Sequence, residues 1–489
     1  MSSASPSDLR ATRTAWWALA VLILGVAMGM LDTTIVNVAL PTIRTSIDAD
    51  EATLSWIISG YALAYGLILI PAGRIGDRVG HKWVFIVGLS GFTVASLACG
   101  IADDATSLVV ARVAQGLFGG LFFPAVTALI QLTFADRTRG RAFAVMGAAI
   151  GVSTALGPIV GGLLIEALGD ADGWRSIFFV NLPFGVVAVV AAILLLPSGA
   201  EGAGARGVDV VGFVLLAGAL VAVLVPLIEG QDLGWPLWTY LSLSGGVVLV
   251  VLFAFWELHL QRRGGTTPLV PPHLFSHPAF TGGVVLALVY FAAFTSIFFT
   301  ISILWQAGLG HSALEAGLVS IPFALGSIVG ASQSDRIAHR LGRTALVLGT
   351  GLVALGLATI WVVFLLVPAA ELTNWHLLAP LAVAGIGSGL FIAPNAQFIV
   401  ATVDRAEAGA ASGVIGTMQR VGSAIGIAVI GSVLFGTLEI AGPADVARGF
   451  TASAAHAMLV SAVFAVAAFA LVFVLPRKVD RGYETVPAE

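Results

Sequence analysis

The chain has 489 residues, of which 58% are hydrophobic and 10% charged, and its mean hydropathy is +1.00. In soluble domains about a quarter of the residues are charged, so this composition excludes an ordinary soluble domain and indicates a polytopic membrane protein. The net charge of −4 excludes little, because its charges are divided between two membrane faces. Cys99 is the only cysteine, which excludes an intramolecular disulfide and a thiolate metal cluster.

Fourteen segments of the chain are long and apolar enough to be membrane-spanning helices, which need about 20 residues each. No connection between them is long enough to form a separate soluble domain. In chain order the predicted helices cover 15–40, 52–72, 82–101, 106–131, 140–168, 176–196, 208–229, 237–258, 280–306, 313–333, 343–367, 376–400, 408–437 and 452–475.

The basic residues support this count. If both termini are cytoplasmic, 18 of the 23 Lys and Arg residues lie on the cytoplasmic side, and only Arg44, Arg175 and Arg448 lie outside. Short cytoplasmic loops are enriched in basic residues, so we expect fourteen spans with both termini in the cytoplasm. The remaining two, Arg112 and Arg420, lie within apolar segments.

The longest predicted cytoplasmic connection runs from about Glu257 to Ala279, and its prolines indicate a linker. We therefore expect an all-α membrane protein with a six-helix bundle in residues 1–200. Two inserted helices and the linker fill 201–279, and a second six-helix bundle fills 280–489. The sequence lacks a Gly-x-x-x-x-Gly-Lys-Ser/Thr phosphate loop, so uphill transport needs an ion gradient or a partner chain.

The first predicted helix carries a carboxylate, Asp32, in an apolar run. An Asp at the centre of a membrane helix costs roughly 2.5–3.5 kcal/mol, and such residues mark proton or substrate paths. Arg112 has the same burial problem, and opposite charges stabilise each other's ionised form, so we expect both to face one cavity. The alternatives are a structural Asp32 bonded to a neighbouring helix and an Arg112 that reaches the outer interface.

A cluster of glycine and charge follows the second helix, in a predicted loop that reads Gly73-Arg-Ile-Gly-Asp77-Arg78-Val-Gly80-His81-Lys82. Glycines permit a tight turn, and Asp77 is suited to the N-terminal end of a neighbouring helix, where the helix dipole favours a carboxylate. An ordinary charged loop explains Arg78 but not the spacing of the glycines. A weaker copy from Asp335 to Arg343 indicates two related halves.

The fifth predicted helix carries a stripe of small residues and proline along one face. Its members are spaced 4, 4, 3 and 4 residues apart: Gly147, Gly151, Ala155, Pro158 and Gly162. Such a stripe lets another helix approach closely, and Pro158 bends the helix. Ordinary tight packing also explains this spacing.

Five segments together resemble the fourteen-helix drug/proton antiporters of the major facilitator superfamily. They are Leu31 to Pro41, Gly73 to Lys82, Arg112 to Gly120, Gly147 to Gly162 and Trp174 to Pro183, and the resemblance extends over essentially the whole chain.

This resemblance implies two bundles that rock about a central site, with proton coupling through Asp32 and Arg112. It also implies a cytoplasmic latch and a fifth helix packed as in exchangers. The latch residues are Gly73, Asp77, Arg78 and Gly80, and the packing residues are Gly147, Gly151, Gly157, Pro158, Gly161 and Gly162. His81 departs from the family, which more often has Arg there, and makes the charge at that position sensitive to pH.

The helices that line the cavity in such proteins supply a candidate substrate site. Tyr61 and Tyr65 share one helical face, as do Phe291, Phe294 and Phe298. Aromatic faces suit flat lipophilic or cationic molecules, although aromatic stripes in membrane helices more often serve packing. The polar candidates are Asn37, Gln115, Asn395, Gln397 and Arg420.

We therefore expect a monomeric, multi-pass antiporter that exports lipophilic drugs, cationic ones included, in exchange for protons, without a cofactor, metal or nucleic acid. Arginine outnumbers lysine 21 to 2, which points to a bacterial plasma membrane. One alternative is a dedicated exporter of an endogenous lipid, siderophore, antibiotic or metabolite, and another is a proton-coupled nutrient importer. We expect no enzyme, because no nucleophile and base are clustered.

The basic-residue split predicts that reporter domains fused to the N-terminus and to the C-terminus both report the cytoplasm. The expected signal is that of a reporter active only inside the cell, with a fusion after Arg175 as the external control. An external C-terminus contradicts the fourteen-span count.

Overall fold

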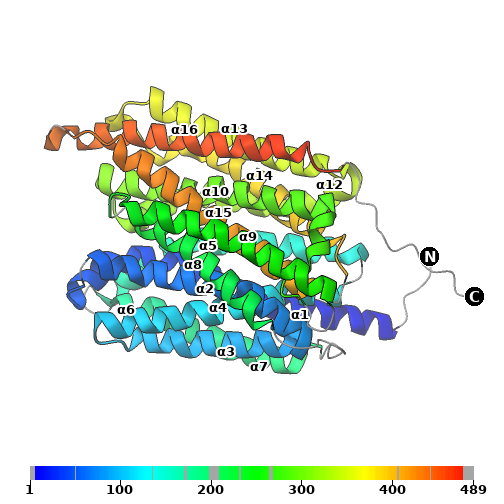
Figure 1. Cartoon of the computed structure of the whole chain (residues 1–489). Coiled ribbons are helices and arrows are strands. Elements are labelled where there is room, and N and C mark those ends of the chain that lie inside the picture. The colour runs from blue at the N-terminus through cyan, green and yellow to red at the C-terminus, as the bar shows by residue number, and fades with distance from the viewer. Residues whose placement is uncertain are drawn as a thin grey trace, which may run out of the picture.

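The computed structural model describes residues 6–49, 51–134, 136–169, 173–197, 209–230, 233–263, 268–404, 407–440 and 442–476. In this part of the chain all regular structure is helical, and fourteen helices are long and apolar enough to cross a membrane. The predicted all-helical class with fourteen spans is confirmed (Figure 1).

The first nine helices are α1 (Pro6–Ser46), α2 (Glu51–Val79), α3 (His81–Gly100), α4 (Ala105–Thr133), α5 (Asp136–Leu168), α6 (Gly173–Phe179), α7 (Asn181–Leu195), α8 (Val210–Glu229) and α9 (Leu237–Arg263). They are followed by η1 (Pro272–Ser276), α10 (Pro278–Ile303), η2 (Leu304–Gly308), α11 (Ala313–Leu318), α12 (Ile321–Leu341), α13 (Thr344–Leu366), η3 (Ala369–Glu371), α14 (Asn374–Val400), α15 (Ala408–Gly436), η5 (Pro443–Asp445) and α16 (Val446–Val472). Four spans consist of two pieces each: α6 with α7, α10 with η2, α11 with α12, and η5 with α16.

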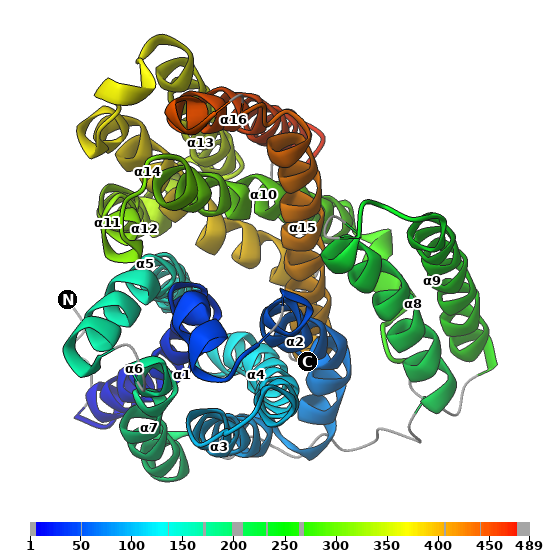
Figure 2. The same cartoon turned by 90° about the vertical axis from the view of Figure 1, so that its left-hand side faces the viewer.

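The helices form two groups with a pair beside them. Figure 2 shows α1–α7 in one group and α10–α16 in the other, with α8 and α9 at the side. The groups meet where α5 packs against α11, α12 and α14 and where α15 packs against α2 and α4. The inserted α8 bridges them, because it contacts α2 and α15 as well as α9.

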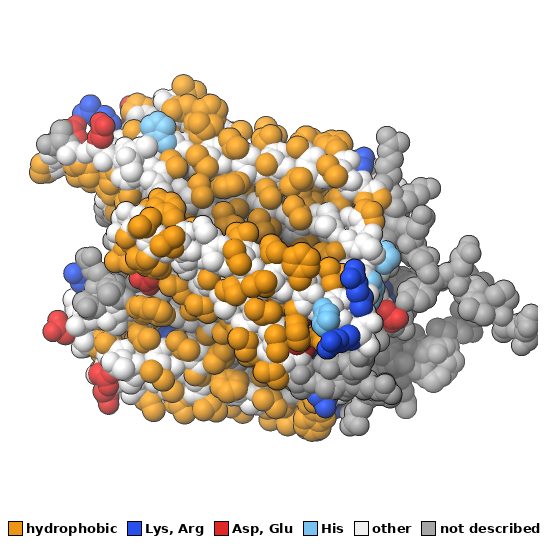
Figure 3. All heavy atoms as spheres, viewed as in Figure 1, with side chains coloured by type: hydrophobic (Ala, Val, Ile, Leu, Met, Phe, Trp, Pro, Cys, Tyr) orange, Lys and Arg blue, Asp and Glu red, His pale blue; other side chains and the backbone are white. Residues whose placement is uncertain are grey.

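The molecule has two polar ends and an apolar side. Figure 3 shows hydrophobic side chains over the face in view and charged side chains gathered at both ends. We call the end where α1 begins and α16 ends the latch end, and the opposite one the far end (Figure 1). A wide apolar surface between polar ends suits a bilayer.

The glycines of α5 serve two neighbours. A Cβ built on Gly157 would collide with Thr34 of α1, and one on Gly161 would lie 2.8 Å from Ile35. The stripe predicted from the sequence faces the other bundle instead: Gly147 lies against Ala393 of α14, Gly151 against Ser327 of α12, Gly162 against Leu314 of α11, and Pro158 against Gly317 of α11. The missing side chains therefore bring α5 close both to its own bundle and to the partner bundle.

Two segments predicted as connections are helical in part. The segment from Gly73 to Val79 is the last part of α2, and only Gly80, with φ +95°, separates it from α3. A single residue suffices because glycine adopts positive φ without strain. Glu257, predicted to begin the linker, lies inside α9 and is buried.

The α1–α5 contact predicts that Gly157→Ala destabilises the protein by about 1–3 kcal/mol, the usual cost of overpacking. Gly147→Ala is the matched control: its Cβ would lie an ordinary 3.6 Å from Ala393. Thermal unfolding in detergent should show a lower midpoint for the first variant and an equal or slightly higher midpoint for the second. Equal midpoints for both variants would contradict the tight α1–α5 contact.

Candidate functional site

A buried ion pair lies inside the first bundle. Arg112 Nη1 of α4 donates to Asp32 Oδ2 of α1 at 2.7 Å, and the two residues are 1% and 0% exposed. Arg112 Nε donates to the carbonyl of Ile57 on α2 at 3.1 Å. The guanidinium therefore does not reach the membrane interface, and the carboxylate is enclosed by helices rather than exposed to a cavity.

Amide side chains complete the shell around Asp32. Its Oδ1 accepts hydrogen bonds from Gln115 Nε2 at 2.9 Å and from Asn181 Nδ2 at 3.1 Å. Both amides also donate to Ser96 Oγ of α3, and Gln115 Oε1 accepts from Arg112 at 2.6 Å. Each charge thus has charge-assisted partners from several helices, which is the condition for keeping an ion pair in a low-dielectric interior.

Sequence reasoning missed two members of this network. Asn181 is the first residue of α7. It lies in the segment from Trp174 to Pro183 that carries the family resemblance, but nothing in that segment indicated that its amide binds Asp32. Ser96 resembles any other small polar residue of a membrane helix. A polar residue amid apolar ones was the only available signal, and it does not identify a partner on another helix.

Two tyrosines connect the ion pair to the interface between the bundles. The guanidinium of Arg112 lies 4.2 Å from the ring centre of Tyr61, and that of Arg420, on α15, lies 4.0 Å from the ring of Tyr65. The two rings are 5.9 Å apart on α2. Cation–π contacts of this kind hold charge against an aromatic face without a carboxylate. The series Arg112–Tyr61–Tyr65–Arg420 therefore runs from one bundle into the other.

At the latch end, Asp77 joins the two bundles. Its carboxylate accepts hydrogen bonds from the backbone N–H groups of Gly409 at 2.9 Å and Ala410 at 3.2 Å. These N–H groups belong to the first turn of α15, where they have no partner within the helix and the dipole favours an anion. Arg74 and His81 flank the carboxylate, at 3.6 Å and 3.1 Å.

Missing side chains allow this contact. A Cβ on Gly73 would collide with the backbone of Gly409, and one on Gly409 would collide with Gly73 and Asp77. Three of the predicted latch residues thus have different roles. Asp77 makes the contact, Gly73 allows the close approach of the two helices, and Gly80 forms the turn. Arg78 is exposed.

Among the described residues, the structure brings only part of the candidate substrate set together, namely Tyr61, Tyr65 and Arg420, with Gln115 beside Arg112. Asn37 is exposed on α1, Gln115 belongs to the Asp32 network, and Asn395 donates to the carbonyl of Gly283 at 3.2 Å. Gln397 donates across the bundles to the carbonyl of Gly140 at 3.3 Å.

The phenylalanine stripe of α10 lies in an aromatic cluster of the second bundle. Phe294 is buried and lies 5.8 Å from Phe323, ring centre to ring centre, whereas Phe291 and Phe298 are half-buried. The cluster continues to Tyr290 and Phe391, whose rings stack at 3.9 Å. Phe294 therefore packs the bundle interior.

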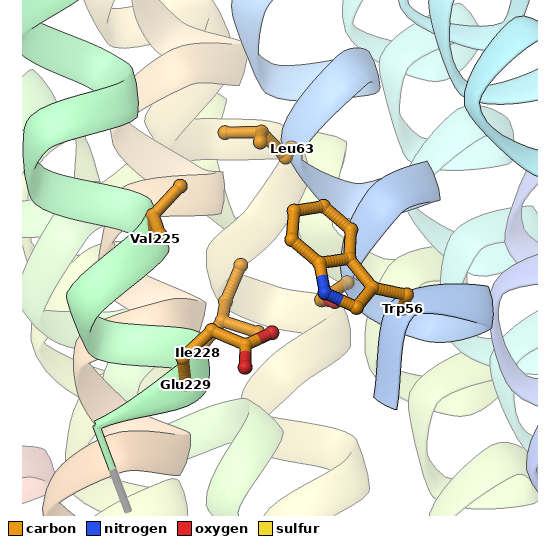
Figure 4. A pocket seen from close by; sticks show the side chains of 6 residues that line it. Trp56, Leu63, Val225, Ile228 and Glu229 are labelled. Atoms are coloured by element: carbon orange, nitrogen blue, oxygen red, sulfur yellow. The ribbon is translucent and has the colours of Figure 1, made fainter. Parts of the chain in front are cut away.

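A crevice opens between α2 and α8. Figure 4 shows Trp56 and Leu63 of α2 facing Val225, Ile228 and Glu229 of α8. It has no room for a drug-sized molecule, whose sites occupy hundreds of Å³. The crevice is a seam between the first bundle and the inserted pair.

Two bundles of six spans each that meet at the latch end, with an ion pair buried inside the first, have the architecture of a membrane transporter. The chain belongs to the Major Facilitator Superfamily, whose sequence model matches residues 22–427. It is a multi-pass protein of the bacterial inner membrane that transports small molecules and is not an enzyme.

Curated relatives and solved structures agree with this assignment. A probable actinorhodin transporter of Streptomyces coelicolor is 37% identical over 89% of this chain and 75% of the relative. The tetracenomycin C resistance and export protein of Streptomyces glaucescens is 34% identical over 86% of this chain and 76% of the relative. The puromycin resistance protein of Streptomyces alboniger is 33% identical over 94% of this chain and 91% of the relative.

The fold is also that of a proton:xylose symporter, with a TM-score of 0.64 and 14% identity over 93% of this chain and 95% of the symporter. The human organic anion transporter MFSD10 has a TM-score of 0.63 and 15% identity over 94% of this chain and 99% of that transporter.

The enclosed network predicts that Arg112→Ala lowers the free energy of unfolding by roughly 3–5 kcal/mol, because it leaves a buried carboxylate unpaired. Adding Asp32→Asn to this variant should restore much of the loss, since no charge then remains. Denaturant unfolding of the two variants in detergent measures both effects. If the second substitution restores nothing, the loss arises from packing instead of charge.

Proposed function

We propose that this protein exports antibiotic-like lipophilic compounds from the cell in exchange for protons, by alternating access and as a monomer. The names of the relatives support the cargo class, because they describe antibiotic export or resistance. The observation that carries the coupling is the carboxylate of Asp32, held in the membrane by Arg112, Gln115 and Asn181.

Protonation of Asp32 would act on this network directly. The neutral acid no longer holds Arg112 as an ion-pair partner, so the guanidinium shifts its balance toward the ring of Tyr61 and the carbonyl of Ile57. Because Tyr61 lies next to Tyr65, and Tyr65 contacts Arg420 of the other bundle, a change at Asp32 reaches the interface that must open. Each cargo exchange would thus require Asp32 to bind and release a proton.

The sidedness follows from the basic residues at the latch end. In the described part of the chain they include Arg13, Arg74, Arg78, Lys82, Arg139, Arg141, Arg262, Arg263, Arg336, Arg340 and Arg343. Their enrichment supports a cytoplasmic latch end. With Asp77 bound to α15, the latch end is closed, and the opposite state of the cycle requires this contact to break.

The coupling hypothesis predicts that Asp32→Asn abolishes uphill, pH-driven efflux but spares protein level and downhill exchange of cargo. Asn has nearly the same shape but carries no exchangeable proton. Vesicles with an imposed pH gradient and a panel of lipophilic cations, anions and neutral drugs provide the measurement. Wild-type accumulation by the variant would make Asp32 structural and place the coupling carboxylate at Glu166, Glu229 or Glu257.

The same vesicles separate the rival functions. Competition among unrelated compounds is expected of a multidrug exporter and not of a dedicated exporter of one metabolite. A pH change of the sign expected for cotransport would instead favour an importer.

Arg420 favours a second candidate, in which the cargo is anionic or phenolic. The charge of Asp32 is satisfied by Arg112, whereas Arg420 is half-buried at the bundle interface against the Tyr65 ring. A guanidinium in apolar surroundings gains most from an anion. An aromatic acid would place its ring near Tyr65 and its charge near Arg420.

This candidate predicts that Arg420→Gln raises KM for aromatic acids by about tenfold or more, the loss of a hydrogen bond to a charged group, and leaves cationic dyes little changed. Arg336→Gln, exposed on α12, is the control. An equal loss for acids and cations would indicate that Arg420 serves the bundle contact only.

A further inference from the structure

Two buried carboxylates face each other at the base of the inserted helices. Asp209 caps the N-terminus of α8, where its Oδ1 accepts from Gly212 N and from Trp256 Nε1, both at 2.8 Å. Glu257 of α9 accepts from Val270 N at 3.4 Å through Oε2. Asp209 is 6% and Glu257 2% exposed.

One oxygen of each carboxylate has no donor. Within the described part of the chain, Asp209 Oδ2 and Glu257 Oε1 are buried and accept no hydrogen bond. A Cβ built on Gly212 would touch both of them, so the two oxygens lie against the same point of α8. Two ionised carboxylates cannot be held face to face in a buried site, and such pairs keep one proton between them.

We propose that Asp209 and Glu257 form a proton-binding site that controls the latch. A proton fits better than a metal ion, because the described residues provide no group of three or more acidic, His or Cys ligands and hard cations take six or more oxygens. Shared between Oδ2 and Oε1, the proton satisfies both unpaired oxygens and leaves a single negative charge.

Hydrogen bonds and an ion pair connect this site to the latch. Glu257 holds the backbone of Val270, and the preceding linker carbonyls, of Pro268 and Leu269, accept from Arg74, with Nε of Arg74 2.8 Å from Leu269 O. Arg74 lies 3.6 Å from Asp77, which binds the first turn of α15. A shift of the linker therefore changes the position of a cation beside the latch carboxylate.

The direction follows from the charges. Loss of the proton places two negative charges together, drives the carboxylates apart and draws Arg74 away from Asp77. The closed latch is therefore favoured while the site holds its proton and is weakened as the pH rises through the titration. The other ionisable groups near this route are His81 beside Asp77, the His273–Glu407 pair on the linker side, and the exposed His259, Arg262 and Arg263 of α9.

Infrared pH-difference spectroscopy on the full chain in lipid nanodiscs tests the proton site without cargo. In the Asp32→Asn background, which removes the carboxyl group proposed for coupling, we expect one buried carboxylic-acid C=O band that titrates and that disappears when either Glu257→Gln or Asp209→Asn is added. Asn retains the helix cap, and Glu371→Gln, exposed on η3, is the control that keeps the band. A band that survives in either variant, or that follows added Na⁺ or Mg²⁺ at fixed pH, overturns the site.

The link to the latch rests on the proposed transport cycle and needs a second measurement. Spin labels on cysteines at Val79 of α2 and Leu341 of α12, both exposed, report the opening of the latch end, and Cys99 is buried. One linked proton changes the closed-to-open ratio by up to about tenfold per pH unit.

We expect Glu257→Gln, whose amide donates permanently to Asp209, to remove this part of the pH response and hold the latch closed at high pH. A full wild-type response in Glu257→Gln overturns the link to the latch. The infrared result does not depend on transport, so failure of the site and failure of the proposed export are distinguishable.

Discussion

The cost of keeping a charge inside a bilayer governs the structure around Asp32. A carboxylate and a guanidinium enclosed by helices remain stable only if nearly every polar atom has a partner. The first bundle meets this condition by converging helices α1, α2, α3, α4 and α7 on the pair, so the site and the packing of the bundle are one arrangement. In the proposed coupling, a proton added to Asp32 would change the partners of every member of this network.

Between the bundles, the contacts are of a different kind. At the latch end a single carboxylate reaches the N–H groups of a helix terminus, and glycines replace side chains that would keep α2 and α15 apart. Hydrogen bonds to free helix N–H groups are strong enough to favour a closed state and few enough to break in a cycle. At the latch end the bundles are therefore held by polar contacts that water can replace, whereas α5 joins them by close packing.

The inserted helices acquire a physical role in this arrangement. Of the two, α8 lies beside α2 and α15, the two helices that form the latch, and the linker that follows α9 is tied to α2 through Arg74. The proton site proposed at their base lies next to that tie. The proposed coupling at Asp32 and the proposed control of the latch are separate in space, because Asp32 lies in the first bundle and the Asp209–Glu257 pair lies outside both.

The sequence by itself determined the number of spans and their approximate bounds. It also singled out Asp32, Arg112 and Asp77 as candidate functional residues. Both were possible because hydrophobic length and the rarity of charges in apolar runs are local properties. It could not assign Asn181 or Ser96 to the ion pair or find Asp209 opposite Glu257, since these partners lie far apart in the chain and look ordinary there. The sequence also suggested a single substrate surface, but the structure separates some of its residues, such as Gln115 and Gln397. Helical periodicity shows which residues share a face, but only the tertiary packing decides which helix, lipid or cavity that face meets.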